Sequence, residues 1–323
     1  MSAKQKLLRG LGYCSFTFSC LVMSIYLTFP GDVLGQRLAH EIALESKGKV
    51  QIQMDDVSLY GLTGVSAEGV TLRYDSGDGV PHRLQLDEVD VRVEILPLMT
   101  ASMVIDGSLR AGKGTVEAEV ERVGAGAFRV DAEIDELNLM SVNIISEMAG
   151  LPILGVISGD VSLDWSKDVK TRTGEVNIRS TGLRVGPGEL SGGALGKLTL
   201  PAVGFGKLDL GMTLGGGKLS VAKFDQQGGD LLADIKGDVS LRSRFASSSV
   251  SGCVKVKGDP AYLAKNPTLK SALELATVRL KKDTADFLNI PLAGTMGNMR
   301  MRGGLCRDGK GAGPKKGRGP KRR

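Results

Sequence analysis

Apolar and polar residues alternate one by one over most of the chain between residues 50 and 258. The pattern is clear in VDVRVEI (89–95), VEAEVER (116–122) and FRVDAEID (128–135). Side chains on a strand repeat every two residues, whereas those on a helix repeat every 3.6. These runs therefore predict strands with one apolar face and one face in water. Gly, Asp, Ser and Pro separate the runs, as is typical of an antiparallel meander.

The phrase GDVSL occurs at residues 159–163 and 237–241, and DDVSL at 55–59 nearly repeats it. Gly159 and Gly237 stand on the apolar row, where a missing side chain permits a bend or close packing across the sheet. We interpret the phrase as a half-exposed strand pattern used at equivalent positions of a curved sheet, with coincidence in a strand-rich chain as the alternative. The candidate lining residues of the apolar surface are Val57, Leu59, Ile157, Val161, Leu163, Trp165, Ile235, Val239 and Leu241.

Glycine is abundant, at 45 residues, and aromatic residues make up only 4%, which suits strands and tight turns. Helical signals are confined to residues 30–46, 141–152 and 259–276, where Asp259 and Asn266 each precede a proline as expected N-caps. Half-apolar strands must stack, close into a barrel or curl into a groove that lipid or protein covers. We predict a mainly β fold: a large curled antiparallel sheet, as a groove or half-barrel, with two or three short helices.

A membrane segment is expected near the amino terminus. Residues 10–30 carry no charge over 21 positions, which is long enough to cross a bilayer as a helix. Lys4, Lys6 and Arg9 precede this run, so the positive-inside rule keeps the amino terminus in the cytoplasm. A cleaved signal peptide would need a small-x-small site, and a lipoprotein signal would end its apolar run at Cys20; neither pattern is present.

These features predict a single-pass protein of the inner membrane. Residues 1–9 would be cytoplasmic, 10–30 a transmembrane helix, 31–302 a periplasmic all-β domain and 303–323 a disordered basic tail.

The net charge of +6 is unevenly distributed: residues 1–9 carry +3 and residues 303–323 carry +7, which leaves −4 for the part between them. A mildly acidic body with basic ends does not predict a nucleic-acid partner. The tail would meet an anionic envelope surface or an acidic partner, or serve only as a solubilising end.

Motifs of catalysis are missing from the sequence. His40 and His82 are the only histidines, and no HExxH, GxSxG or CxxC pattern occurs. We therefore expect no enzyme and no cofactor, with both histidines at the surface.

The cysteines fit an exported domain without defining it. Cys253 and Cys306 would lie in an oxidising compartment and are a candidate disulfide, with two free thiols as the alternative. Cys14 and Cys20 fall in the membrane segment, on well-separated faces of a helix.

Several longer segments resemble the GspN family of the type II (general) secretion pathway, in the long form found in deltaproteobacteria. They are LPAVGFGKLDL (200–210), FDQQGGDLLADIKGDVSLRS (224–243), NPTLKSALELA (266–276), IPLAGTMGNMRM (290–301), FPGDVLGQRL (29–38) and SLYGLTGVSAEGVTL (58–72). The resemblance covers about residues 25–302. It implies an accessory inner-membrane component that contacts the inner-membrane platform or the outer-membrane secretin. The organisation is also similar to that of AsmA-like envelope proteins, whose curled sheet holds lipid in a hydrophobic groove.

Two functions therefore compete. The first is a secretion scaffold that binds other subunits through exposed strand edges or through the polar, solvent-exposed face of the sheet. The alternative is a lipid-binding or lipid-transfer protein whose apolar face holds phospholipid. A continuous open apolar surface would favour lipid binding, and a closed sandwich would favour the scaffold.

Overall fold

The structure is a computed structural model. It describes residues 3–75, 81–95, 97, 102–142, 146, 151–191, 197–244, 247–278, 280–296, 298–301 and 304–306. It confirms the mainly β fold, built on a large open antiparallel sheet. The chain divides into two compact units, Met1–Glu121 with Ser141–Ile144, and Arg122–Met140 with Ile145–Arg323.

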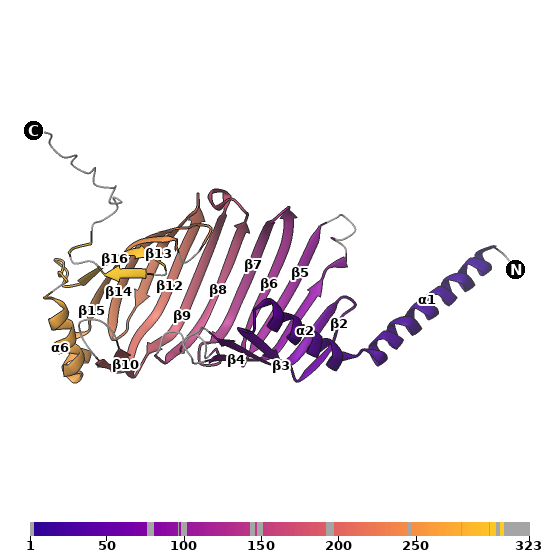
Figure 1. Cartoon of the computed structure of the whole chain (residues 1–323), viewed down its shortest axis with the longest axis horizontal. Helices are drawn as coiled ribbons and strands as arrows, with labels where there is room; N and C mark the ends of the chain where they lie inside the picture. The colour runs from indigo at the N-terminus through magenta and orange to yellow at the C-terminus, as the bar shows by residue number, and fades with distance from the viewer. Residues whose placement is uncertain are drawn as a thin grey trace, which may run out of the picture. The chain divides into compact units, whose positions relative to one another are not determined.

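The first unit starts with helices and continues as strands (Figure 1). Its elements are α1 (Ala3–Thr28), α2 (Gly31–Glu45), β1 (Val50–Gln53), β2 (Asp56–Tyr60), β3 (Gly64–Asp75), β4 (Pro81–Val93), β5 (Met103–Ala111) and β6 (Gly114–Gly124). The strand order is β1-β3-β4-β5-β6, and β2 also pairs with β3. From β2 onward, strands that follow one another in the sequence are neighbours, as in the predicted meander.

The apolar core of the first unit includes residues of α2 and of the segment that joins it to α1. Val57, Ala67 and Val70 are buried and pack against residues that include Phe29 and Leu34. Helix α2 approaches β2 closely because Gly35 has no side chain: a Cβ there would lie 2.9 Å from Cγ2 of Val57. The helix predicted over residues 30–46 is confirmed as α2.

The second unit is a longer meander. Its elements are β7 (Ala127–Asn138), β8 (Ile153–Trp165), the 3-10 helix η1 (Val169–Thr171), β9 (Thr173–Val185), β10 (Gly188–Ser191), β11 (Lys197–Leu200), β12 (Val203–Gly215), β13 (Lys218–Gln227), β14 (Leu231–Ser240), β15 (Ser249–Gly258), α5 (Pro260–Lys265), α6 (Pro267–Ala276), β16 (Leu288–Thr295) and β17 (Asn298–Met301). The order β7-β8-β9-β12-β13-β14-β15-β16-β17 does not return to its start, so this sheet is open. Strands β10 and β11 form a separate hairpin.

Helix signals in the second unit are mostly confirmed. The Asp259 side chain accepts hydrogen bonds from the backbone N–H groups of Ala261 and Tyr262 and caps α5. Asn266 stands at the N-cap position of α6, before Pro267, as expected, but its side chain makes no hydrogen bond to α6. Its Nδ2 instead donates to the carbonyl of Tyr262, because Asn266 also ends α5.

Two other sequence predictions fall outside the described residues. Most of the helix predicted over residues 141–152 lies there, as does the basic tail apart from residues 304–306.

The predicted faces of residues 89–95 are wrong at three positions. Asp90 is only 9% exposed, whereas Val91 is 45% and Ile95 47% exposed. Asp90 lies between Ser66 of β3 and Ser108 of β5, and Oγ of Ser108 donates to its Oδ2 at 3.1 Å. Val91 faces Gly107, which has no side chain to cover it.

Candidate functional site

One face of the sheet in the second unit carries apolar side chains on strand after strand. The cross-strand register places them side by side: Val161 of β8 lies between Ala132 of β7 and Val176 of β9. We call this set the apolar face: Phe128, Val130, Ala132, Ile134, Ile157, Val161, Leu163, Trp165, Val176, Ile178, Leu208, Leu210, Met212, Leu214, Leu219, Val221, Phe224, Ala233, Ile235, Val239, Val250, Val254, Val256, Leu288, Ile290, Leu292, Met299 and Met301.

Most side chains of the apolar face are half-buried. Only Leu214 and Leu288 are buried, and Met301, on the last strand, is 72% exposed. A second layer packed on a sheet buries the strand centres, as α2 buries Val57 in the first unit. Within the described part of the second unit, the centres of β8 and β14 do not reach that burial, and on β9 only Ser180 does. The arrangement is an open apolar surface of the kind that marks a binding site.

The glycines of the repeated phrase bring strands together on this face. A Cβ at Gly159 would collide with the carbonyl oxygen of Asn177 on β9. A Cβ at Gly237 would lie 2.9 Å from Cα of Gly252, the residue opposite it on β15. The close packing expected from the sequence is therefore present at both copies.

Trp165 lies at the end of the apolar face, opposite Phe128. The guanidinium carbon of Arg172 lies 3.5 Å from the centroid of its ring. Arg172 is 7% exposed, and its Nε donates to the carbonyl of Ser166 at 2.8 Å. This cation–π contact fixes the indole at the border between the apolar surface and water.

Six of the nine predicted lining residues belong to the apolar face, and three do not. Val57 lies in the closed core beneath α2, so its assignment to an open surface is wrong. Leu59 is half-buried opposite Val65 in the first unit. Leu241 follows the end of β14, where its backbone N–H donates to the carbonyl of Gly217 at 2.7 Å. The copy at residues 55–59 lies in a different setting because helix α2 packs on Val57.

The opposite face of the same sheet is charged, and its side chains form ion pairs and hydrogen bonds between neighbouring strands. Arg129 pairs with Asp164 at 3.1 Å, and Nδ2 of Asn177 donates to Asp160 at 2.9 Å. Further along, Lys218 pairs with Asp238 at 3.0 Å, and Lys223 pairs with Asp209. These exposed pairs keep this face in water, so the two faces differ sharply in polarity.

The ladder between β13 and β14 joins residues 218–220 to residues 238–240. Beyond it, Gln226 serves as a side-chain bridge. Its Nε2 donates to the carbonyls of Phe205, Gly228 and Leu231, and its Oε1 accepts from the N–H of Ala233. The polar side chain thus replaces backbone pairing where the two strands separate.

A disulfide joins Cys253 of β15 to Cys306, with 5.8 Å between their Cα atoms. Asn289, 1% exposed, lies nearby and accepts from the N–H of Cys306. Lys255 pairs with Asp283 at 3.3 Å. Burial raises the pKa of Asp283, but hydrogen bonds from the N–H groups of Phe287 and Ala285 and the Lys255 ammonium outweigh it and lower the pKa overall.

Ligands for a metal do not gather in the described part of the chain, where no group of three His, Cys, Asp or Glu side chains has suitable geometry. His82 is buried rather than at the surface, because its ring stacks on Tyr74 of the neighbouring strand, with 6.5 Å between centroids. His40 is exposed, as expected.

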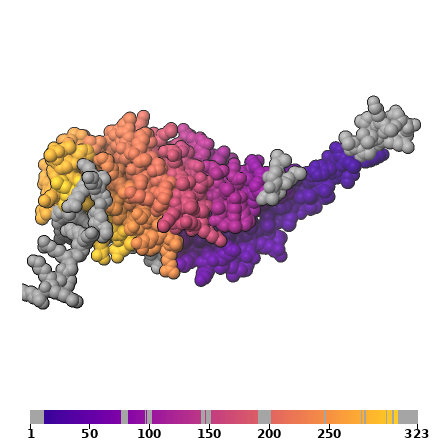
Figure 2. All heavy atoms as spheres, turned by 90° about the horizontal axis from the view of Figure 1, so that it is seen from above, coloured from indigo at the N-terminus to yellow at the C-terminus, as the bar shows by residue number. Residues whose placement is uncertain are grey.

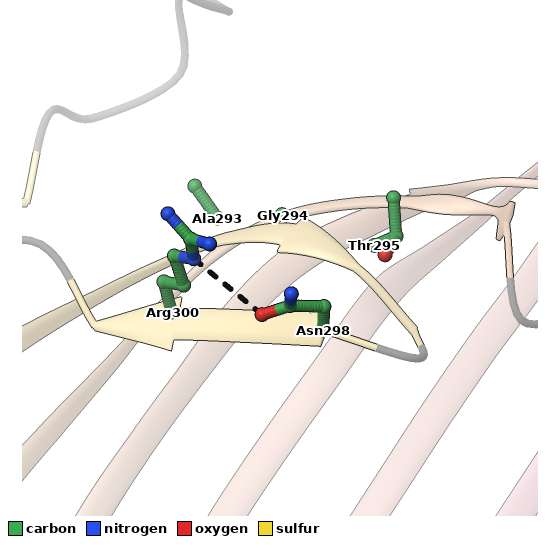
Figure 3. A pocket seen from close by; sticks show the side chains of 5 residues that line it. All are labelled: Ala293, Gly294, Thr295, Asn298 and Arg300. Carbon is green, nitrogen blue, oxygen red and sulfur yellow. Dashed lines mark hydrogen bonds between the residues drawn. The ribbon is translucent and has the colours of Figure 1, made fainter.

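A shallow hollow of about 310 Å³ lies where β16 and β17 meet (Figure 3). It is lined by Ala293, Gly294, Thr295, Asn298 and Arg300, and Nε of Arg300 donates to Oδ1 of Asn298 at 3.4 Å. It holds one charged group and no pair of groups suited to acid–base chemistry.

Most of the amino-terminal helix projects away from the strands of its own unit, and only its carboxyl end lies next to β2 (Figures 1 and 2). Lys4, Lys6 and Arg9 lie in its first turns, and Cys14 and Cys20 are free and exposed. Among the described residues, no single helix has the length and hydropathy of a membrane span; Gly12–Thr28 and Gly31–Glu45 meet the criteria only as a pair, bent by 64°.

Comparison with protein-family models, with curated proteins and with solved structures gives no match. The resemblance to the GspN family stays a prediction.

Sequence reasoning missed most of the apolar face, although the signal was present. Val176 and Ile178 alternate with polar residues in GEVNIRS, and Leu210 and Met212 do so in KLDLGMTL. Strand pairing, which the alternation does not encode, places the first run beside β8 and the second beside β9.

Proposed function

We propose that this chain is a single-pass protein of the cell inner membrane whose carboxyl-terminal part lies in the periplasm and binds phospholipid. The apolar face would form a curved groove that shields acyl chains from water, while the charged face stays in solvent. The observation that carries the proposal is the continuous, half-buried apolar face from β7 to β17.

The dimensions of the strands suit this ligand. Strand β8 has 13 residues, which at about 3.3 Å per residue is roughly 43 Å. An acyl chain spans half of a hydrocarbon core that is about 30 Å thick, or roughly 15 Å, so it fits along a strand. Apolar patches larger than a few hundred Å² are rare on soluble surfaces unless they bind something.

Two further features support the proposed location. The disulfide between Cys253 and Cys306 is a bond that persists in oxidising compartments such as the periplasm. The uncharged run at residues 10–30, with Lys4, Lys6 and Arg9 before it, orients the carboxyl-terminal part outward.

The test is site-specific photo-crosslinking in living cells. A photoreactive residue at Leu163 lies on the apolar face, and the matched control at Ser162 lies on the next residue of the same strand, on the charged face beside Asp131 and Glu175. We expect phospholipid adducts at position 163 and none at 162. Absence of lipid adducts at 163, or equal yields at both positions, overturns the proposal.

A second candidate function is the secretion scaffold implied by the resemblance, and strand β17 favours it. This strand ends the sheet order, and its four residues Asn298–Met301 are all exposed. An exposed edge offers unpaired backbone groups to a strand of another subunit. Replacement of Arg300 by proline would remove one N–H from this strand; loss of crosslinks to secretion subunits with lipid adducts intact would support the scaffold, and unchanged crosslinks would refute it.

A further inference from the structure

The three-residue turn between β2 and β3, residues 61–63, carries an exposed leucine at its tip. Leu62 is 63% exposed, and Tyr60 beside it is 42% exposed. Tight turns are normally formed by Gly, Asn, Asp or Ser, which tolerate water and unusual backbone angles. Gly61, with φ of 61°, meets that need, but Leu62 does not. Leu62 and Tyr60 thus form a small exposed apolar group at the tip of this turn.

The turn is held rigidly, so its exposure does not come from a loose loop. Oγ1 of Thr63 donates to the carbonyl of Val93 at 2.6 Å, and the N–H of Val93 donates to the carbonyl of Thr63 at 3.4 Å. These two bonds tie the turn to the end of β4.

The turn also contacts the carboxyl end of α1, which Figure 1 shows next to β2. The hydroxyl of Tyr26 donates a hydrogen bond to the carbonyl of Gly61. Tyr26 lies two residues before the end of α1 at Thr28, or about 3 Å along the helix axis. Tyrosine is enriched where a membrane helix leaves the hydrocarbon core. The bond therefore places the turn beside the last turn of α1.

We infer that the β2–β3 turn is a second membrane contact, in which Leu62 and Tyr60 insert into the lipid interface beside α1. The occupant of this surface is the bilayer, because the turn is continuous with a helix whose own exposed side chains, such as Leu27 at 77%, are apolar. This inference rests on the membrane anchor of the proposed function. It adds that the sheet itself contacts the lipid surface.

The test places a photoreactive residue at Leu62 in the full chain in native membranes. Position 62 is exposed, so a bulky residue fits without disturbing the fold. The control is Leu44 near the end of α2, which is 60% exposed. Because α2 leaves α1 at 64° and begins at Gly31, Leu44 lies about 8 Å further from the α1 exit along the α1 axis.

We expect at least fivefold more lipid adduct at position 62 than at position 44. Equal yields, no lipid adduct at 62, or adducts to another protein overturn the inference. If lipid adducts persist at Leu163 while none form at position 62, the proposed membrane contact of the turn is refuted and the proposed lipid-binding function is not. If alkaline extraction releases the chain from membranes, the anchor and the inference fail together.

Discussion

Replacing Val161 by asparagine tests whether the apolar face holds lipid. Full burial of a valine side chain contributes about 1.5–3 kcal/mol, so half-buried Val161 contributes roughly 1 kcal/mol to folding. Against an acyl chain, an amide without hydrogen-bond partners costs about 1–3 kcal/mol. At 1.4 kcal/mol per tenfold change, phospholipid affinity falls by about 5- to 140-fold.

The control is Ser162→Asn, which puts the same residue in the same strand but on the charged face. Val161→Asn also loses the strand propensity of valine, which Ser162→Asn does not, so the stability of both variants is needed to interpret the difference in lipid. The assay is the amount of phospholipid retained per purified chain, measured by mass spectrometry, with thermal unfolding recorded beside it. The reasoning is refuted if V161N and S162N retain equal lipid, or if V161N loses lipid only because it no longer folds.

Three other predictions concern stability. Gly237→Val forces a side chain against Gly252 and should destabilise the protein by about 1–3 kcal/mol in denaturant unfolding. Gly215→Ala, where a Cβ meets nothing within 4 Å, should cost less; equal costs would contradict the packing argument. Cys306→Ser removes the disulfide, which joins residues 53 positions apart, and should lower the free energy of unfolding by about 2–4 kcal/mol. Adding reductant should not destabilise this variant further. A variant as stable as the oxidised wild-type protein would contradict the prediction. The pKa of Asp283 is lowered in the folded chain, so its stabilisation is present above the ordinary value of 3.8 and disappears as pH falls through the folded pKa. An NMR titration midpoint above 3.8 would refute that sign.

The strands were predictable from the sequence because their signal is local. Alternation in residues 128–135 reports which residues share a face without any knowledge of neighbours. The cap of α5 by Asp259 was predictable for the same reason, since the bonds reach only to Ala261 and Tyr262.

The errors arose where the burial of a residue depends on residues that are distant in the sequence. Val57 has the same local letters as Val161, yet it is buried because Gly35 lets α2 approach β2. Asp90 is buried because Ser66 and Ser108 flank it from two other strands. Neither circumstance can be read from residues adjacent in the chain.

The cation–π pair of Trp165 and Arg172 has a practical consequence. Trp165 is the only tryptophan in the chain, and it lies at the border of the apolar face with 44% of its surface exposed. Its intrinsic fluorescence therefore reports on that border without any added dye. An acyl chain arriving beside Phe128 would move the indole into a drier environment and shift its emission to shorter wavelength, so the chain contains its own optical sensor of occupancy.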